Sequence, residues 1–175
     1  MTAVVELLAA FVASSAREEA DWCAMLRLAE ELEDPLSRNE ASAHFTASAL
    51  VVDDECTRVC LVAHAKLGRL LQPGGHVEPT DLSLEAAALR EAREETGLEL
   101  VLHPTAPRPF DLDVHEIPAR ADEPRHWHLD VRYLLVGTGD PCEGGAQWYR
   151  LGEAGDESVG RLAEKALKLG SPAAG

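Results

Sequence analysis

A glycine pair at positions 74–75 stands shortly before an amphipathic segment, residues 83–96, that has the period of a helix. Ser83 can cap the start of this helix, Glu85 suits its first turn, and Gly97 suits the left-handed position after its end. At roughly 100° per residue, small apolar residues share one arc and three glutamates continue it. These residues are Leu84, Ala87, Ala88, Glu91, Glu94 and Glu95. The carboxylates therefore lie in line with the face that packs.

Such an arrangement is costly without a cation. Like charges three or four residues apart destabilise a helix by about 0.2–0.5 kcal/mol per pair, and partial burial adds to the penalty. Carboxylates with no His or Cys on the same arc suit Mg²⁺, with Mn²⁺ as the alternative. A solvated helix in which Arg90 pairs with Glu94 would leave the glycine loop unexplained.

The rest of the chain mixes helices and strands without a regular alternation. Helical spacing over residues 4–12, and a capping box of Ser15 and Glu18 before residues 16–32, predict two N-terminal helices. Strands are predicted over 44–53, 58–65, 98–102, 126–136 and 147–151, a proline-containing loop over 104–124, and a final helix over 159–169. We expect an α/β (α+β) sandwich, with an N-terminal helical extension over residues 1–41 and the main domain over residues 42–170.

The net charge and the cysteine pattern restrict the binding partners and the cell compartment that the sequence favours. A formal net charge of −15 argues against long nucleic acid, whereas a bound cation still allows a small phosphorylated ligand. No apolar run approaches the ~20 residues of a membrane helix, and Glu6 interrupts the apolar start, so neither a membrane partner nor a signal peptide is expected. The cysteines form no C-x-x-C pair, which fits free thiols in a cytoplasmic protein. The N-terminal helices suit a lid, a packed cap or the surface of a homodimer.

The segment from Gly75 to Leu98 resembles the Nudix box, G-x5-E-x7-R-E-U-x-E-E-x-G-U, where U is a bulky aliphatic residue. Its second half is matched by Arg90, Glu91, Glu94, Glu95 and Gly97, with Ala92 smaller than the pattern asks. In the first half, Asp81 stands in place of glutamate, and one extra residue precedes Arg90. The resemblance implies a Nudix α/β/α sandwich with a mixed sheet. It also implies a metal-dependent hydrolase that cleaves a diphosphate bond in a nucleoside-diphosphate-linked small molecule, by water attack at phosphorus.

The resemblance also implies residue roles. Glu91, Glu94 and Glu95 would hold Mg²⁺ or Mn²⁺, together with the backbone carbonyl of Gly74, and one glutamate would help to activate water. Arg90 would orient the carboxylates. Gly75 would allow the tight turn of the loop over the helix, and His76, in that loop, is a candidate for binding phosphate.

Two alternating trios suit a substrate cleft, a general base or an additional metal site, with a solvated strand edge as the alternative interpretation. On strands, His126, His128 and Asp130 share one face, and Asp111, Asp113 and His115 would do the same. The first trio is the stronger candidate for the substrate cleft, because Trp127, Leu129, Val131 and Tyr133 take the opposite, core-facing side. His44 and His64 are interpreted as structural.

Two alternatives to hydrolysis remain open. One is a non-catalytic Nudix module that binds a nucleotide or ADP-ribose, against which the full carboxylate set argues. The other is an isoprenoid-diphosphate isomerase, which needs a positioned thiol, and Cys60 is the plausible thiol.

Overall fold

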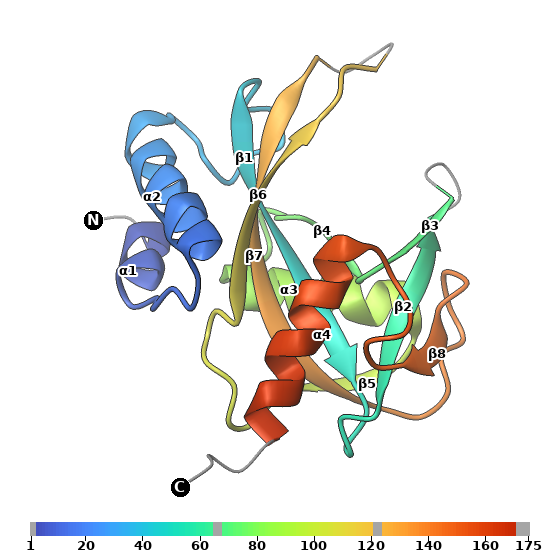
Figure 1. Ribbon diagram of the computed structural model, residues 1–175. Coiled ribbons are helices and arrows are strands. Elements are labelled where there is room, and N and C mark those ends of the chain that lie inside the picture. The colour runs from blue at the N-terminus through green and yellow to red at the C-terminus, as the bar shows by residue number, and fades with distance from the viewer. Residues whose placement is uncertain (1–2, 65–67, 121–123, 171–175) are drawn as a thin grey trace, which may run out of the picture.

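The computed structural model describes residues 3–64, 68–120 and 124–170, which contain four helices and eight strands (Figure 1). The helices are α1 (Ala3–Ala9), α2 (Ala16–Glu31), α3 (Leu84–Thr96) and α4 (Glu157–Gly170). The strands are β1 (Ala43–Val52), β2 (Arg58–His64), β3 (Arg69–Leu71), β4 (Gly74–His76), β5 (Glu99–Leu102), β6 (Asp111–Ile117), β7 (His126–Thr138) and β8 (Gln147–Arg150).

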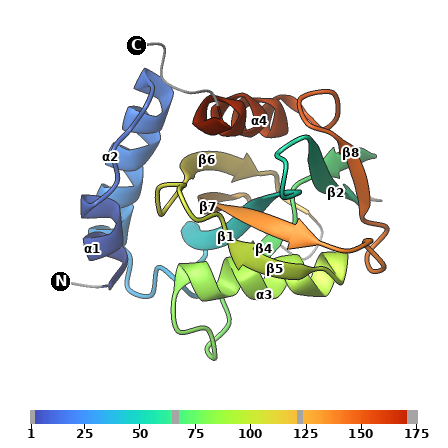
Figure 2. The same cartoon turned by 90° about the horizontal axis from the view of Figure 1, so that it is seen from below.

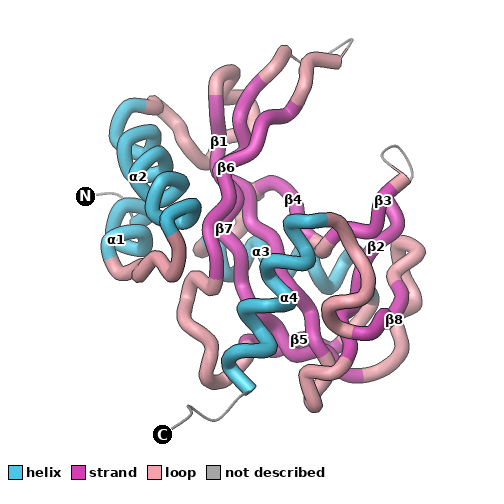
Figure 3. The backbone as a smooth tube through the Cα atoms, in the orientation of Figure 1, coloured by secondary structure: helices cyan, strands magenta, loops and turns pink. Residues whose placement is uncertain are grey.

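The strands form one mixed sheet around a long central pair. β1 and β7 run parallel over ten residue pairs, from Ala43 beside Trp127 to Val52 beside Val136. The other pairings among the described strands are antiparallel: β2 and β4 flank β1, β5 and β6 flank β7, and β3 and β8 pair with β2. Figure 3 shows how the strands cross the middle of the molecule.

Helices cover both faces of the sheet. α3 and α4 lie on opposite sides of the central strands, as Figure 2 shows, which gives the expected α/β/α sandwich. Odd-numbered residues of β1, such as Phe45 and Ala47, pack in one core cluster with Ala87 and Ala88 of α3. Leu50 packs with α4 in a second cluster.

The N-terminal helices pack against the sheet as a cap. Leu8 and Met25, both fully buried, belong to the same core cluster as Phe45. The Ser15 side chain accepts a hydrogen bond from the Glu18 amide, as the capping box predicts. The Glu18 carboxylate, however, accepts from the Ser14 amide and hydroxyl and pairs with Lys165 of α4. Glu18 therefore joins the cap to α4.

The predicted loop over residues 104–124 is wrong in its middle. Residues Asp111–Ile117 form β6, which pairs with β7 along its whole length. The prolines at 109 and 118 lie outside this strand, so they leave its ladder hydrogen bonds intact. β4 forms at the glycine pair of positions 74–75, which the sequence interpretation did not assign to a strand. Ala65 and residues 121–123, which fall within predicted segments, lie outside the described residues.

α3 begins and ends as its sequence predicts. The Ser83 hydroxyl accepts a hydrogen bond from the Ala86 amide, and Gly97 adopts a left-handed conformation with φ of 68°. In the part of the chain that the structure describes, no helix has both the length and the apolar character needed to cross a membrane.

Candidate active site

Three rows of polar side chains run across β1, β7 and β6, on the sheet face that also carries α4. The rows form because the register between β1 and β7, and that between β7 and β6, place alternate residues of the three strands side by side. The rows are Ser48, Arg132 and Asp111, then Thr46, Asp130 and Asp113, then His44, His128 and His115.

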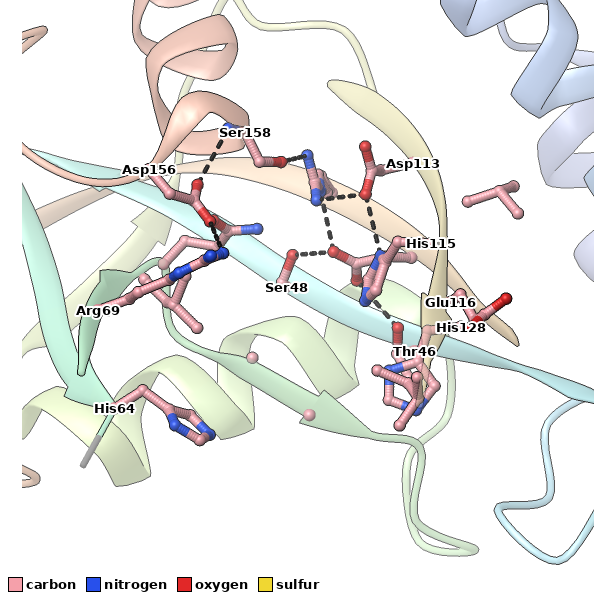
Figure 4. Close-up of a pocket in the computed structure, with 18 of the residues that line it drawn as sticks. Thr46, Ser48, His64, Arg69, Asp113, His115, Glu116, His128, Asp156 and Ser158 are labelled. Carbon is pink, nitrogen blue, oxygen red and sulfur yellow. Dashed lines mark hydrogen bonds and ion pairs between the residues drawn. The ribbon is translucent and has the colours of Figure 1, made fainter. Parts of the chain in front are cut away.

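Arg132 is the centre of the first two rows and is 2% exposed. Its Nε donates to Asp130 Oδ2 at 2.9 Å and its Nη2 to Asp113 Oδ2 at 2.9 Å. Burial opposes the charged guanidinium, but the neighbouring aspartates outweigh it and raise the pKa of Arg132. Asp130 also accepts from Thr46 at 3.1 Å and from Ser48 at 2.7 Å (Figure 4). The Asp130 carboxylate is thus held by three donors.

Arginines from both terminal regions complete this network. Arg17 of α2 and Arg161 of α4 reach Asp113 Oδ1 at 2.9 and 3.2 Å. Burial opposes ionisation of Asp113, but the hydrogen bond from His115 and the nearby arginines keep the pKa of Asp113 well below its usual range. The N-terminal cap and α4 therefore both help to hold Asp113 in position.

The pKa of Asp111 is shifted upward, in the opposite direction to that of Asp113. Burial, together with a hydrogen bond to Glu18, raises the pKa of Asp111 to about 7. Burial also opposes ionisation of Glu18, but hydrogen bonds involving Asp111, Lys165 and Ser14 outweigh it and lower the pKa of Glu18 to about 2. Asp111 is consequently about half protonated near pH 7, and its protonated form donates to the ionised Glu18.

Five histidines gather around the third row, and one of them, His76, comes from β4. The ring centroid of His128 lies 4.9–5.4 Å from those of the other four, which are His44, His76, His115 and His126. Burial and the four neighbouring imidazoles lower the pKa of His128 to about 2, so this ring is neutral.

The acidic part of the site lies where α3 passes β4. The Gly74 amide donates to Glu95 Oε2 at 3.0 Å, and a Cβ on Gly75 would lie 2.6 Å from Glu91 Cδ. Glycine is therefore needed at 75 for this close approach. Burial is the main cause that raises the pKa of both Glu91 and Glu95. The Glu94 side chain is 60% exposed.

Arg90 connects α3 to the loop before it. It makes a bidentate contact with Asp81, from Nε at 3.1 Å and from Nη2 at 2.9 Å, and Nη2 also donates to the His76 carbonyl at 3.0 Å. Its Nη1 donates to Glu91 at 2.9 Å and to Glu94 at 3.3 Å. Asp81, the residue that departs from the Nudix pattern, is thus a principal partner of Arg90.

β4 separates two concave regions. A cleft of about 920 Å³ is lined by the polar rows and by Arg17, Arg69 and Arg161. A second hollow of about 690 Å³ is lined by Glu91, Asp81 and Glu78. Gly75 and His76 line both regions, so the acidic residues of α3 and the cleft meet at β4.

The structure brings together most of the residues singled out in the sequence. Arg90, Glu91 and Glu95 lie beside Gly74 and Gly75, while His76, His128 and Asp130 line the cleft on the other side of β4. His126 is 3% exposed and lies behind His128, with 3.2 Å between their Nε2 atoms. Trp127, predicted to be in the core, is 42% exposed, whereas Leu129, Val131 and Tyr133 are buried as expected.

Several residues of the site escaped the sequence interpretation. The alternation that includes His128 and Asp130 continues to Arg132, and a similar alternation on β1 includes His44, Thr46 and Ser48. His44 was interpreted as structural, yet it lies in the histidine cluster. Extending the period-two pattern would have found these residues, but no local pattern indicates Arg17 or Arg161.

Comparison with known proteins agrees with this architecture. The NUDIX domain family model matches residues 43–168. A solved hydrolase of the NUDIX family from Clostridium perfringens is 30% identical, with a TM-score of 0.53 over 72% of this chain and 97% of that one. A solved UDP-X diphosphatase shares the fold at 17% identity, with a TM-score of 0.51 over 87% of this chain and 79% of that one. No curated protein matches the sequence. The chain belongs to the Nudix family of pyrophosphohydrolases.

Proposed function

We propose that this protein hydrolyses the diphosphate bond of a nucleoside-diphosphate-linked small molecule, with Mg²⁺ or Mn²⁺ as cofactor and with water attacking phosphorus. The observation that carries the proposal is the imbalance of charge at β4. One guanidinium, that of Arg90, contacts Asp81, Glu91 and Glu94, and Glu95 lies partly buried beside them. Burial raises the pKa of Glu91 and Glu95, and the Arg90 guanidinium offsets this only in part at Glu91.

The donor set fits a hard divalent cation. Glu91, Glu94 and Glu95 supply oxygen ligands from one helix, and such ligands favour Mg²⁺ or Mn²⁺ over softer metals. A bound cation would neutralise the diphosphate and lower the pKa of an attacking water. The chain itself fixes the carboxylates: the Gly74 amide holds Glu95, and Arg90 holds Glu91.

The cleft next to β4 has the size to receive the rest of the substrate. Small-molecule sites typically measure about 300–1,000 Å³, and this cleft of about 920 Å³ falls in that range. Arg69 and Arg161 line the cleft, where they pair with Asp156 and Asp113, and they are the candidate donors to a phosphate group. His76, which lines both hollows, is suited to bind phosphate at the junction.

The isomerase alternative finds no support in the position of Cys60. This thiol is fully buried in the core cluster on the face that α3 covers, and burial raises its pKa to about 12. A thiol in that environment is not available to protonate or deprotonate a substrate in the cleft.

The test is turnover of a panel of diphosphates, comprising nucleotide sugars, ADP-ribose, dinucleotides and nucleoside triphosphates. We expect at least one to be hydrolysed with Mg²⁺ or Mn²⁺, and activity to disappear when a chelator removes the metal. Products labelled from ¹⁸O-water should carry the label on phosphate, because the attack is at phosphorus. Full turnover in protein verified to be metal-free would contradict the metal dependence, and binding without turnover across the panel would favour a ligand-binding module.

A further inference from the structure

We propose that His44, His76 and His128 form a second metal site, which binds a divalent transition cation of the Zn²⁺ type. The three residues come from three strands of the sheet. His44 of β1 and His128 of β7 are register partners, and His76 of β4 pairs opposite Thr46, two residues along β1. The site is separate from the α3 carboxylates, and its existence does not depend on the proposed hydrolysis.

The imidazoles are close enough to share one ion. One ring nitrogen from each of the three lies within 4.8 Å of the others. Ring centroids are 5.1 Å apart for His44 and His76, 4.9 Å for His44 and His128, and 5.3 Å for His76 and His128. Zn–N bonds of about 2.0–2.1 Å in a tetrahedron place ligand nitrogens about 3.4 Å apart. Side-chain rotations that draw the nitrogens together by about 1.5 Å or less complete that geometry.

Two backbone carbonyls fix the tautomers of His44 and His128, and so decide which ring nitrogen of each can bind a metal. His44 Nδ1 lies 3.3 Å from the Glu40 carbonyl, which can only accept, so Nδ1 carries the proton and Nε2 holds the lone pair. His126 Nδ1 lies 2.9 Å from the Pro124 carbonyl, and its Nε2 is 3.2 Å from His128 Nε2. By the same reasoning His128 donates from Nε2 and keeps the lone pair on Nδ1. Hydrogen bonds of this kind from the second nitrogen are what orient metal-binding histidines.

The donor chemistry selects the ion. Three neutral imidazoles suit Zn²⁺, Cu²⁺, Ni²⁺ or Co²⁺, whereas Mg²⁺ prefers oxygen ligands and binds such a set poorly. Because His76 and His128 line the cleft, a fourth coordination position would face the space that admits small molecules. Three histidines with one open position are typical of zinc sites that bind water or an anion.

His76 connects the two metal sites. Its side chain belongs to the histidine cluster, while its backbone carbonyl accepts from Arg90, which also contacts Glu91. A cation on the histidines would therefore lie beside the same short strand that borders the acidic residues. The different donor sets allow the sites to be filled independently.

The first test is calorimetric titration of the metal-stripped protein with Zn²⁺ in excess Mg²⁺, which occupies the carboxylates. We expect one Zn²⁺ per chain, with affinity at least ~100-fold weaker in His76→Ala and His128→Ala, since even the partners of metal ligands contribute about 10–100-fold. His64→Ala is the matched control, because His64 lines the same cleft outside the cluster. A Glu94→Gln, Glu95→Gln double variant should bind Zn²⁺ as the wild type does. Undiminished binding in both histidine variants, or loss in the glutamate variant, overturns the proposal.

A second test needs no variant. Co²⁺ in place of Zn²⁺ should give the strong visible absorption of a four-coordinate nitrogen site, and Zn²⁺ but not Mg²⁺ should displace it. The weak absorption typical of six oxygen ligands would place the ion on the carboxylates and refute the histidine site. Circular dichroism of each variant confirms the fold, and His76→Asn, on a half-buried edge strand, serves if an alanine variant unfolds.

Discussion

The acidic helix α3 and the polar rows on β1, β7 and β6 both bring carboxylates out of water, but they compensate them differently. In the rows, Arg132, Arg17 and Arg161 contact Asp113, and Arg132 also contacts Asp130. On α3, Arg90 is shared with Asp81 in the loop, and Glu95 depends on one backbone amide. The rows are a self-sufficient ion network that gives rigidity. Under the proposed activity, an added cation would complete the compensation of the α3 carboxylates.

Removing the centre of the rows should have the largest effect. Arg132→Met would leave Asp130 without its guanidinium partner and remove one of the three arginines that contact Asp113, and breaking a buried ion pair costs about 3–5 kcal/mol. Urea denaturation should show this loss, whereas Arg27→Met, which breaks an exposed pair with Glu31, should change stability by less than about 0.5 kcal/mol. A loss below about 1 kcal/mol for Arg132→Met would mean that the rows are not self-compensating.

Neutralising the glutamates of α3 should lower the catalytic rate and leave the stability of the fold nearly unchanged. Glu94→Gln and Glu95→Gln should each lower kcat at least ~100-fold against the best diphosphate, because metal binding or proton transfer is lost. The unfolding free energy should stay equal or rise slightly, since one repulsive charge is removed. Glu99→Gln, an exposed change on β5, is the control. Wild-type turnover in both helix variants would remove these residues from the site.

Alanine substitutions at the adjacent glycines 74 and 75 should differ in effect, because the first should lower stability and the second should lower activity. A Cβ on Gly74 would lie 2.6 Å from the Ser48 backbone, so Gly74→Ala should cost about 1–3 kcal/mol. On Gly75 its three nearest atoms would be those of the flexible Glu91 carboxylate, so Gly75→Ala should keep stability and lower kcat roughly tenfold or more by displacing that carboxylate. Denaturation and kinetics on both variants decide the matter, and equal effects on stability would contradict the distinction.

The smallest expected effect is the contribution of Asp111 to the pH dependence of stability. Its pKa rises from 3.8 in the reference state to about 7, so its contribution to stability is present below about pH 4 and is lost as pH rises through about 7. Glu18, with a pKa of about 2, stays ionised over that upper range. Asp111→Asn imitates the neutral acid, so its stability relative to wild type should increase between about pH 5 and about pH 8.

Urea denaturation at the two ends of that range measures the trend. Asp113→Asn is the matched control, because the pKa of Asp113 lies well below the range and its loss should cost stability at both ends. A constant difference between Asp111→Asn and the wild type would show that Asp111 is ionised throughout.

The sequence alone determined the parts of this protein that depend on near neighbours. The caps of α3 at Ser83 and Gly97 follow from side-chain and backbone preferences within one turn, and the packing arc with its glutamates follows from a period of 3.6 residues. The alternation on β7 likewise indicated which side chains share a face. The resemblance to the Nudix box depended on the same local spacing.

Only the tertiary structure decided which faces meet. The parallel pairing of β1 with β7 joins residues more than eighty positions apart, and its register places His44 beside His128 and Thr46 beside Asp130. β6 is a strand because β7 supplies its hydrogen bonds, despite the prolines on either side. Arg17 and Arg161 reach the same aspartate from opposite ends of the chain. A register between distant strands has no signature in either strand, because it is set by the combined burial of both faces and by hydrogen bonds that form only once the sheet assembles.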